Sequence, residues 1–289
     1  MGVSTFLRSN ILYVIWFLLY FFIAWIILGA NLTSFIIVTI VYSISISLAL
    51  SPMGEMLLRA LEGYREPATE EEIRYLMPLF EEVYESAKEV NPKLNDGIKL
   101  YIMDALYVNA FAVGRKTIGV TKGAIATFTA DELKGILAHE LGHMNYGHTK
   151  ALLLSTIGNI FFSIIVLVFR IILSFISFIS AIVTRFNIAG IAFMFITFIA
   201  QIFVNVSVFV FITISEVILG LNSRANEIQA DTFAYEMGYG KELISSMYII
   251  QKISMSAKIK LSERMKAAHP HIADRIANLE QLENATTEE

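Results

Sequence analysis

Two long apolar stretches open the chain, and each is long enough to cross a membrane as a helix. They cover residues 11–30 and 32–50, with a short turn around Asn31 between them. At 1.5 Å per residue, about 20 helical residues span the hydrocarbon core of a bilayer. The pattern therefore predicts a transmembrane hairpin over residues 1–50. A cleaved signal peptide is the alternative for the first stretch, but that stretch is longer than a typical signal sequence and a second span follows at once.

A second apolar region covers residues 151–220 and predicts another helical hairpin, with its turn at 185–187 where the chain becomes polar. Each arm has about 30 residues, more than one bilayer crossing needs, so tilt or extension beyond the membrane is expected. Arg170 interrupts the first arm and is expected to snorkel, to face a polar groove, or to mark where the arm leaves the lipid. A buried helix pair in a large soluble protein is the alternative, which the similar N-terminal pair disfavours.

The polar segments 51–150 and 221–289 are predicted to form one discontinuous domain, interrupted by the hairpin at 151–220. Basic residues near the ends of membrane spans mark the cytoplasmic side. Arg185 is the one basic residue on the opposite side of the predicted spans, whereas the polar side holds Arg8, Arg59, Arg65, Lys150 and Arg224. We therefore expect a multi-pass protein of the cell membrane, with both termini and the polar domain in the cytoplasm.

Short helices and strands are predicted for the first polar segment. Two Thr-x-x-Glu capping boxes indicate helix starts at Thr69 and Thr129. Pro78 is expected to kink the first of these helices or to divide it in two. Stretches 98–103 and 117–121 are typical of short strands. The chain is thus expected to be an α+β membrane protein that is mostly helical.

The second polar segment is predicted to be helical as well. Ser223 is a plausible N-cap for a helix that runs through Glu236 and ends at Gly238. Further helices fit residues 242–258 and 274–282.

Composition narrows the function. The chain of 289 residues is 56% hydrophobic and 17% charged, with a mean hydropathy of +0.62, a balance shifted toward membrane proteins. The net charge of −4 argues against a nucleic-acid partner. Because the chain has no cysteine, any metal must be held by histidine and carboxylate groups. No feature of the sequence indicates an oligomeric state.

Residues His139 to His143 read His-Glu-Leu-Gly-His and lie within the helix that starts at Thr129. Residues four apart share one helical face, so both imidazoles can reach one cation. Glu140 can point toward a water molecule on that cation and act as general base. Two surface histidines on an amphipathic helix are the alternative.

A catalytic zinc site needs three protein ligands and one open position. Glu227 and Asp231 are four residues apart on a predicted helix, so Glu227 can be the third ligand while Asp231 orients one histidine through its other ring nitrogen. The alternative for this acidic pair is a solvated helix face.

These motifs resemble the M48 family of zinc endopeptidases, with the HtpX-type membrane heat-shock proteases as the nearest branch. The resemblance rests on His139–His143, on Ser223–Asp231 and on 109–114, and extends to His269 with Arg275. It implies a thermolysin-like fold with a small β-sheet, one zinc ion held by His139, His143 and Glu227, and Glu140 as general base. It also implies that Asn109, Ala110 and Phe111 lie in a strand that binds substrate backbone.

The other histidines and Arg275 have weaker assignments. His148 is expected at a surface or interface, away from the metal. His269 and Arg275 either supply positive charge to a tetrahedral oxyanion or fix the C-terminal segment on the catalytic domain. His271 has no argument beyond proximity, and it stands where the family more usually has a second proline.

The expected function is zinc-dependent cleavage of misfolded or damaged membrane proteins in protein quality control. A prenyl-peptide (CaaX-type) protease is one alternative, but four spans are too few for its large membrane chamber. A site-2 intramembrane protease would carry its zinc helix inside an apolar run, unlike this chain. A catalytically silent scaffold that keeps zinc for folding is the alternative from another class, and Glu140 argues against it.

Overall fold

The computed structural model describes residues 11–150, 153, 167–168, 170–179, 181–182, 188–256 and 272–287. The described part is mostly helical and has one small sheet, as the sequence predicts. Its helices are α2 (Ile11–Ile27), α3 (Leu32–Ala49), α4 (Pro52–Glu62), α5 (Glu70–Val90), α6 (Lys122–Thr127), α7 (Ala130–Tyr146), α9 (Ile188–Glu236), α10 (Gly240–Ser256) and α12 (Ile272–Thr287). Its strands are β1 (Tyr64–Arg65), β2 (Lys99–Met103), β3 (Ala110–Val113) and β4 (Thr117–Thr121).

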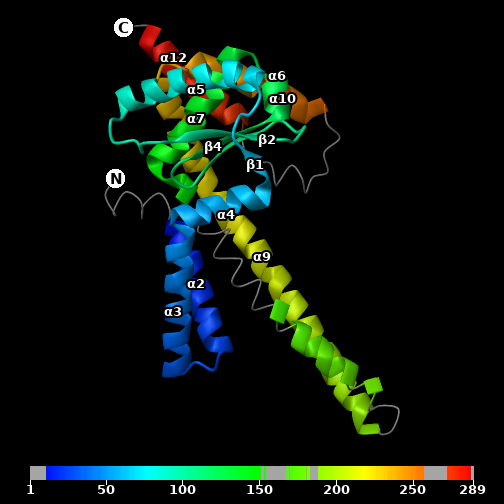
Figure 1. Ribbon diagram of the computed structural model, residues 1–289. Helices are drawn as coiled ribbons and strands as arrows, with labels where there is room; N and C mark the ends of the chain where they lie inside the picture. Colours follow the sequence, from blue (N-terminus) through cyan, green and yellow to red (C-terminus); the bar gives the residue numbers. More distant parts are fainter. Residues whose placement is uncertain are drawn as a thin grey trace.

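The sheet and the shorter helices form a head, from which α2, α3 and α9 project (Figure 1). The sheet is mixed and has the order β1-β2-β4-β3. Strands β2 and β4 are parallel, whereas β1 and β3 are antiparallel to their neighbours. Strand β3 pairs only with β4 among the described strands, so it forms one edge of the sheet.

The predicted helix starts in the head are confirmed. Thr69 and Thr129 each cap a helix, and in both cases the glutamate three residues later completes a capping box. The prediction for Pro78 is resolved in favour of one helix, because α5 continues through it from Glu70 to Val90. This helix is amphipathic, and its buried side faces the core of the head.

One hydrophobic core joins the sheet to the helices of the head. Its most buried side chains come from both strands of the parallel pair and from six helices, and include Leu76, Val83, Ile102, Ile118, Ala124, Leu137, Phe233, Met247 and Leu279. Segments before and after the apolar region 151–220 therefore share a single core, which supports α7 and the end of α9 from all sides.

Helices α2 and α3 form an antiparallel pair that exposes its apolar side chains. Asn31 caps α3 through a capping box with Ser34, so the turn between the two helices is well defined. Phe21 packs edge-on against Phe35 and Tyr42 of the other helix, with ring centroids 5.4 and 5.6 Å apart. Ile26, Leu32 and Ile44 remain more than half exposed, which suits a lipid environment rather than water.

Within the described residues, only α3 is both long and apolar enough to cross a membrane. Shorter apolar stretches lie at Phe17–Ile26, Arg170–Ile179 and Ile191–Val206. The hairpin turn predicted at residues 185–187 lies outside the described residues.

Helix α9 is longer than predicted. It runs without interruption over 49 residues, so Ser223 lies inside this helix and the prediction that it caps a new helix is wrong. The polar sequence that follows the apolar run continues the same helix, because only the character of its surface changes there. The predicted end near Gly238 is confirmed, since α9 stops at Glu236 and Gly238 has a φ of +87°.

Helix α4 lies between the head and the α2–α3 pair and is attached to the head by a buried carboxylate (Figure 1). Glu55 accepts hydrogen bonds from the backbone N–H of Arg115 (2.5 Å) and of Lys116 (3.2 Å), and from the hydroxyl of Thr117 (3.2 Å). These donors belong to the turn between β3 and β4 and to the first residue of β4. We call Glu55 and these three partners the Glu55 anchor.

Candidate metal centre

Helix α7 carries the predicted motif His139, Glu140 and His143 on the side that faces α9. His139 and Glu140 are buried, and His143 is partly exposed. The helix starts at the Thr129 capping box and ends at Gly147, which is left-handed with φ of +75°. Because four residues nearly complete a helical turn, the two imidazoles project in the same direction.

A close approach of α7 and α9 brings the acidic residues to the histidines. A Cβ at Gly142 would lie 2.8 Å from both the Cα and the carbonyl oxygen of Ala230, so a larger residue would push the two helices apart. Gly142 lies between His139 and His143 on α7, and Ala230 lies between Glu227 and Asp231 on α9. The contact therefore places both pairs opposite each other.

His139, His143 and Glu227 converge on one point. The Nε2 atoms of the two histidines are 3.1 Å apart, and the Glu227 oxygens lie 3.5 Å from His139 Nε2 and 3.4 Å from His143 Nε2. In a tetrahedral zinc site with bonds of 2.0–2.1 Å, ligand atoms are about 3.3 Å apart. The three groups thus fit a single zinc ion, and their donor set is one that zinc favours.

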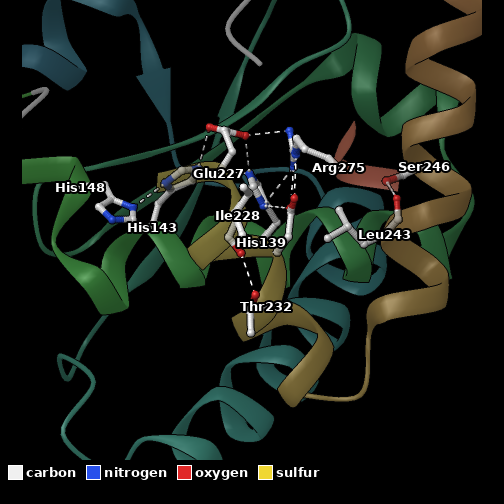
Figure 2. Close-up of polar contacts among 10 residues, drawn as sticks. His139, His143, His148, Glu227, Ile228, Thr232, Leu243, Ser246 and Arg275 are labelled. Carbon is white, nitrogen blue, oxygen red and sulfur yellow. Dashed lines mark hydrogen bonds and ion pairs between the residues drawn. The ribbon is translucent and has the colours of Figure 1, made fainter. Parts of the chain in front are cut away.

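Arg275 lies beside Glu227 and His139 (Figure 2), and Asp231 contacts both Arg275 and His139. Asp231 Oδ1 is 2.8 Å from His139 Nδ1, the ring nitrogen that points away from the ligand cluster. Arg275 of α12 donates to both oxygens of Asp231, at 2.7 and 2.6 Å, and its Nη1 lies 2.7 Å from Glu227 Oε2. All three charged groups are buried, so this contact ties α12 to α9 and α7.

The charges of this cluster shift one another's pKa values. Burial and the Arg275 guanidinium lower the pKa of His139, but the carboxylates of Asp231 and Glu227 outweigh them and raise it to about 9. Burial raises the pKa of Asp231, yet hydrogen bonds from Arg275 and His139 hold it below its usual value. Asp231 therefore stays ionised, and its carboxylate accepts a hydrogen bond from the protonated Nδ1 of His139. A cation at Nε2 would have to displace a second proton, as metal binding commonly does.

His148 is buried, which corrects the prediction that it lies at a surface or interface. Its Nδ1 lies 3.0 Å from His143 Nδ1, and its Nε2 lies 3.2 Å from the Gln229 side-chain oxygen of α9. Burial and the neighbouring His143 lower the pKa of His148 to about 3, so its ring is neutral near pH 7. A neutral ring that donates from Nε2 to Gln229 accepts at Nδ1, and His143 then donates its Nδ1 proton and leaves Nε2 for a metal.

Sequence reasoning missed this connection because Gln229 is 81 residues from His148. Helical spacing gives no signal for it, because Gln229 is two residues from both Glu227 and Asp231 and residues two apart project from different sides of a helix.

The remaining predicted residues are placed as follows. Ala110 and Phe111 lie in edge strand β3, and Asn109 directly precedes it, with its backbone N–H donating to the Thr121 hydroxyl at 3.0 Å. The Phe111 ring packs against Tyr64, with a centroid separation of 4.6 Å. His269 and His271 lie outside the described residues. Arg275 is part of the buried cluster, where its described contacts are with Asp231, Glu227 and His139.

Comparison with known proteins identifies the family. The model of peptidase family M48 matches residues 74–283, which is most of the chain and includes every group of the metal cluster. The chain belongs to peptidase family M48. As a member it is a metalloprotease, and the resemblance seen in its sequence motifs is confirmed.

Named relatives agree with this family. The chain is 26% identical over 260 residues to a "Protease HtpX homolog" of Methylacidiphilum infernorum, covering 82% of this chain and 81% of the relative. It is 25% identical over 279 residues to "Protease HtpX" of Alcanivorax borkumensis, covering 88% and 87%. These matches to M48 membrane proteases favour a membrane zinc metalloprotease over both the prenyl-peptide protease and the silent scaffold.

A solved structure of similar shape is also known. The crystal structure of S. mikatae Ste24p matches with a TM-score of 0.48 at 19% sequence identity, over 96% of this chain and 66% of the Ste24p chain.

Proposed function

We propose that this M48 protease binds one zinc ion through His139, His143 and Glu227 and uses Glu140 as its general base. The observation that carries the proposal is that the two Nε2 atoms lie 3.1 Å apart and each lies 3.4–3.5 Å from an oxygen of the Glu227 carboxylate. When bound, zinc would polarise the scissile carbonyl and lower the pKa of its bound water.

The chain's own residues would then manage the protons. Glu140 is buried on the same helix as the histidine ligands, where it is placed to accept a proton from the attacking water and to deliver it to the leaving amine. Asp231 would keep the His139 ring oriented through Nδ1, and His148 would do the same for His143.

The sequence leaves two roles open for Arg275, stabilising the oxyanion or fixing the C-terminal segment, and we favour the second. Its guanidinium binds Asp231 on one side and Glu227 on the other, so its donors already have carboxylate partners inside the site. It would fix α12 on the site and hold the Glu227 carboxylate in place. The positive charge for the oxyanion would then come from another group, and His269 remains the candidate.

The substrate would bind as an extended strand along β3. This strand is at the edge of the described sheet, and α7 packs beside it. An edge strand offers free backbone N–H and C=O groups to a peptide, which gives affinity without demanding a particular sequence. That property suits a protease that acts on misfolded chains.

The membrane arrangement belongs to the same proposal. Residues 1–50 would form one transmembrane hairpin and 151–220 a second, inserted into a discontinuous, thermolysin-like catalytic domain made of 51–150 and 221–289. The catalytic domain and both termini would lie in the cytoplasm of a multi-pass membrane protein. The exposed apolar surface of the α2–α3 pair and the hydropathy of α3 support this arrangement.

The substrates would be misfolded or damaged membrane proteins, cut in segments outside the bilayer. A site attached to the membrane by the same chain meets such segments at high effective concentration. The resemblance of the sequence motifs to HtpX-type heat-shock proteases, with which the names of the relatives agree, supports this role in quality control.

The test compares the purified full-length protein with Glu140→Gln in casein cleavage and zinc content. We expect one zinc per chain in both proteins and a loss of cleavage of about 10²–10⁴-fold in the variant, the usual contribution of a general base. Glu89→Gln, at an exposed site on α5, is the matched control and should cleave as the wild type does. Equal cleavage by Glu140→Gln would disprove the role of Glu140, and wild type without zinc would disprove the metal.

A further inference from the structure

Helix α4 turns sharply away from the end of α3. Ser51 caps α4 with an extended backbone and Pro52 occupies its first turn, so the helix cannot continue straight from α3. Gly54 closes the corner, because a Cβ there would lie 2.4 Å from the carbonyl oxygen of Ala49. Figure 1 shows the result, with α4 lying across the end of α3 and beneath the sheet.

One face of α4 is buried against the head. Glu55 belongs to the anchor described above, and Leu58 packs in a small cluster with Ala49 and Val113. The corner with α3 and the anchor to the β3–β4 turn therefore hold α4 at both the membrane side and the head side.

The opposite face of α4 is apolar and exposed. Met53, Met56 and Leu61 are 59%, 57% and 64% exposed, and Leu57 lies beside them. Their spacing of three and four residues makes one continuous stripe on the helix. The stripe begins at Met53, four residues after the end of α3, so it continues the exposed apolar surface of the predicted span.

On the other side of α4, where Glu55 and Arg59 face the head, lies a cleft of about 740 Å³ with basic walls. Leu50 and Pro52 line its apolar end, where α3 passes into α4, and its other walls include Arg59, Lys99, Arg115 and Lys116. An apolar entrance next to a cationic interior has the polarity of a phospholipid, whose acyl chains adjoin a charged headgroup.

The acidic groups at this cleft are already engaged. Glu55 is held by backbone N–H groups, and Asp96 pairs with Lys88 at 2.6 Å. Among the described contacts, the side chains of Arg115 and Lys116 have no ion-pair partner. Burial and the charge of nearby Arg115 lower the pKa of Lys150, so cations also gather where the second apolar region begins.

We propose that α4 and this cleft bind the surface of an anionic bilayer. The apolar stripe lies in the interfacial layer, and Arg115 and Lys116 hold the phosphate of an anionic phospholipid in the cleft. The Glu55 anchor then fixes the height of edge strand β3 above the membrane. This inference rests on the membrane attachment proposed above.

The first test measures where α4 lies in a membrane. Because the chain has no cysteine, single substitutions can each carry one fluorophore in the full-length protein. Met56→Cys and Leu61→Cys report the stripe. Ile40→Cys reports the predicted span, and Ile73→Cys, an exposed apolar site on α5, is the matched control. Figure 1 shows α5 and α4 on opposite sides of the sheet.

The labelled proteins are reconstituted in vesicles that contain lipids with a quencher near the headgroup or in the acyl chain. We expect the headgroup-level quencher to remove most of the signal at positions 56 and 61 and to leave position 73 unchanged. If position 40 is quenched by acyl-chain lipids while 56 and 61 behave like 73, the proposal for α4 is overturned and the membrane attachment stands. If position 40 is not quenched either, the proposal for α4 and the proposed membrane attachment are both wrong.

The second test addresses the cleft. Protein extracted from mixed phosphatidylcholine and phosphatidylglycerol membranes is analysed for the lipid that remains bound. We expect wild type to retain a higher fraction of phosphatidylglycerol than the Arg115→Gln, Lys116→Gln double variant. Lys93→Gln with Lys241→Gln, two exposed sites outside the cleft, should match wild type. Equal retention by the cleft variant and wild type would overturn the headgroup site.

Discussion

The metal centre and the Glu55 anchor both bury carboxylates in the head, but they satisfy them differently. Asp231 and Glu227 both pair with the Arg275 side chain, which comes from a helix more than 40 residues away in sequence. Glu55 is satisfied by backbone N–H groups and a hydroxyl, without a close ion pair, since Arg59 stands 3.8 Å away. The first arrangement depends on one cation, whereas the second is built into the shape of a turn.

The difference shows what each region can tolerate. Losing Arg275 would leave the buried carboxylates of Asp231 and Glu227 with only their histidine contacts, and incompletely paired charges are costly in a low-dielectric interior. The Glu55 anchor has three separate hydrogen-bond donors, so a substitution at Glu55 would lose some of these hydrogen bonds and keep others. Four predictions follow from this contrast, in order of expected size.

Arg275→Leu should be the most damaging change. Breaking a buried ion pair by removing one partner costs about 3–5 kcal/mol. That corresponds to a drop of roughly 6–20 °C in the unfolding temperature for a domain of this size. Circular dichroism of the detergent-solubilised protein measures it. The double variant Arg275→Leu, Asp231→Leu should recover part of the loss, because the apolar pair no longer buries Asp231 unpaired. If Arg275→Leu alone is as stable as wild type, Arg275 does not stabilise the fold through its ion pairs with Asp231 and Glu227.

Asp231→Asn should weaken the metal site more than the fold. The amide can still contact His139 Nδ1 but no longer carries the charge that orients and polarises the ring. Loss of such a partner typically lowers metal affinity or activity by about 10–100-fold. Zinc affinity by chelator competition checks this, with Asp274→Asn on the exposed side of α12 as control. An unchanged affinity would rule out the orienting role.

Glu55→Gln should weaken the fold and leave the metal site unchanged, the opposite of Asp231→Asn. The amide replaces one acceptor oxygen with a donor that faces a backbone N–H, which costs about 1–3 kcal/mol of stability. Zinc affinity should stay at the wild-type value, because the anchor lies outside the metal cluster. Glu62→Gln, exposed on the same helix, is the control. A loss of zinc affinity like that of Asp231→Asn would show that the two regions are not independent.

His148 should give the smallest effect at neutral pH, because its contribution is a pH dependence of stability that appears only below about pH 6.5. Its pKa is about 3 in the folded chain and about 6.5 when unfolded, so the unfolded state binds more protons between these values. Stability should therefore fall as the pH drops from 6.5 toward 3, by at most about 1.4 kcal/mol per pH unit. In metal-free protein, His148→Gln should flatten this fall. An identical pH profile would show that His148 titrates normally.

The sequence predicted the parts of the site that depend on local helix geometry. The capping box at Thr129 and the spacing of His139 and His143 define one helical face, and Glu227 with Asp231 define another. What joins the two faces was not predictable in the same way. The Gly142–Ala230 contact, like the bond from His148 to Gln229, depends on how two distant helices pack.

The errors have physical causes as well. Ser223 was expected to begin a helix because polarity changes there, but backbone hydrogen bonding continues unchanged through α9. The Glu55 anchor spans about 60 residues and uses backbone donors, which no side-chain motif reveals. A carboxylate beside Leu58 on the inner side of an amphipathic helix was the one available signal.

Helix α9 has a mechanical consequence. Exposed apolar side chains extend along it at least to Phe209, and Glu227 lies 18 residues farther along the same uninterrupted helix, about 27 Å away at 1.5 Å per residue. A tilt of about 2° at Phe209 would move the Glu227 carboxylate by about 1 Å, well beyond the ±0.2 Å that metal coordination tolerates. In the proposed membrane arrangement, a change in bilayer thickness or curvature that tilts α9 would therefore shift Glu227, and the ion pairs of Arg275 with Glu227 and Asp231 would resist that shift.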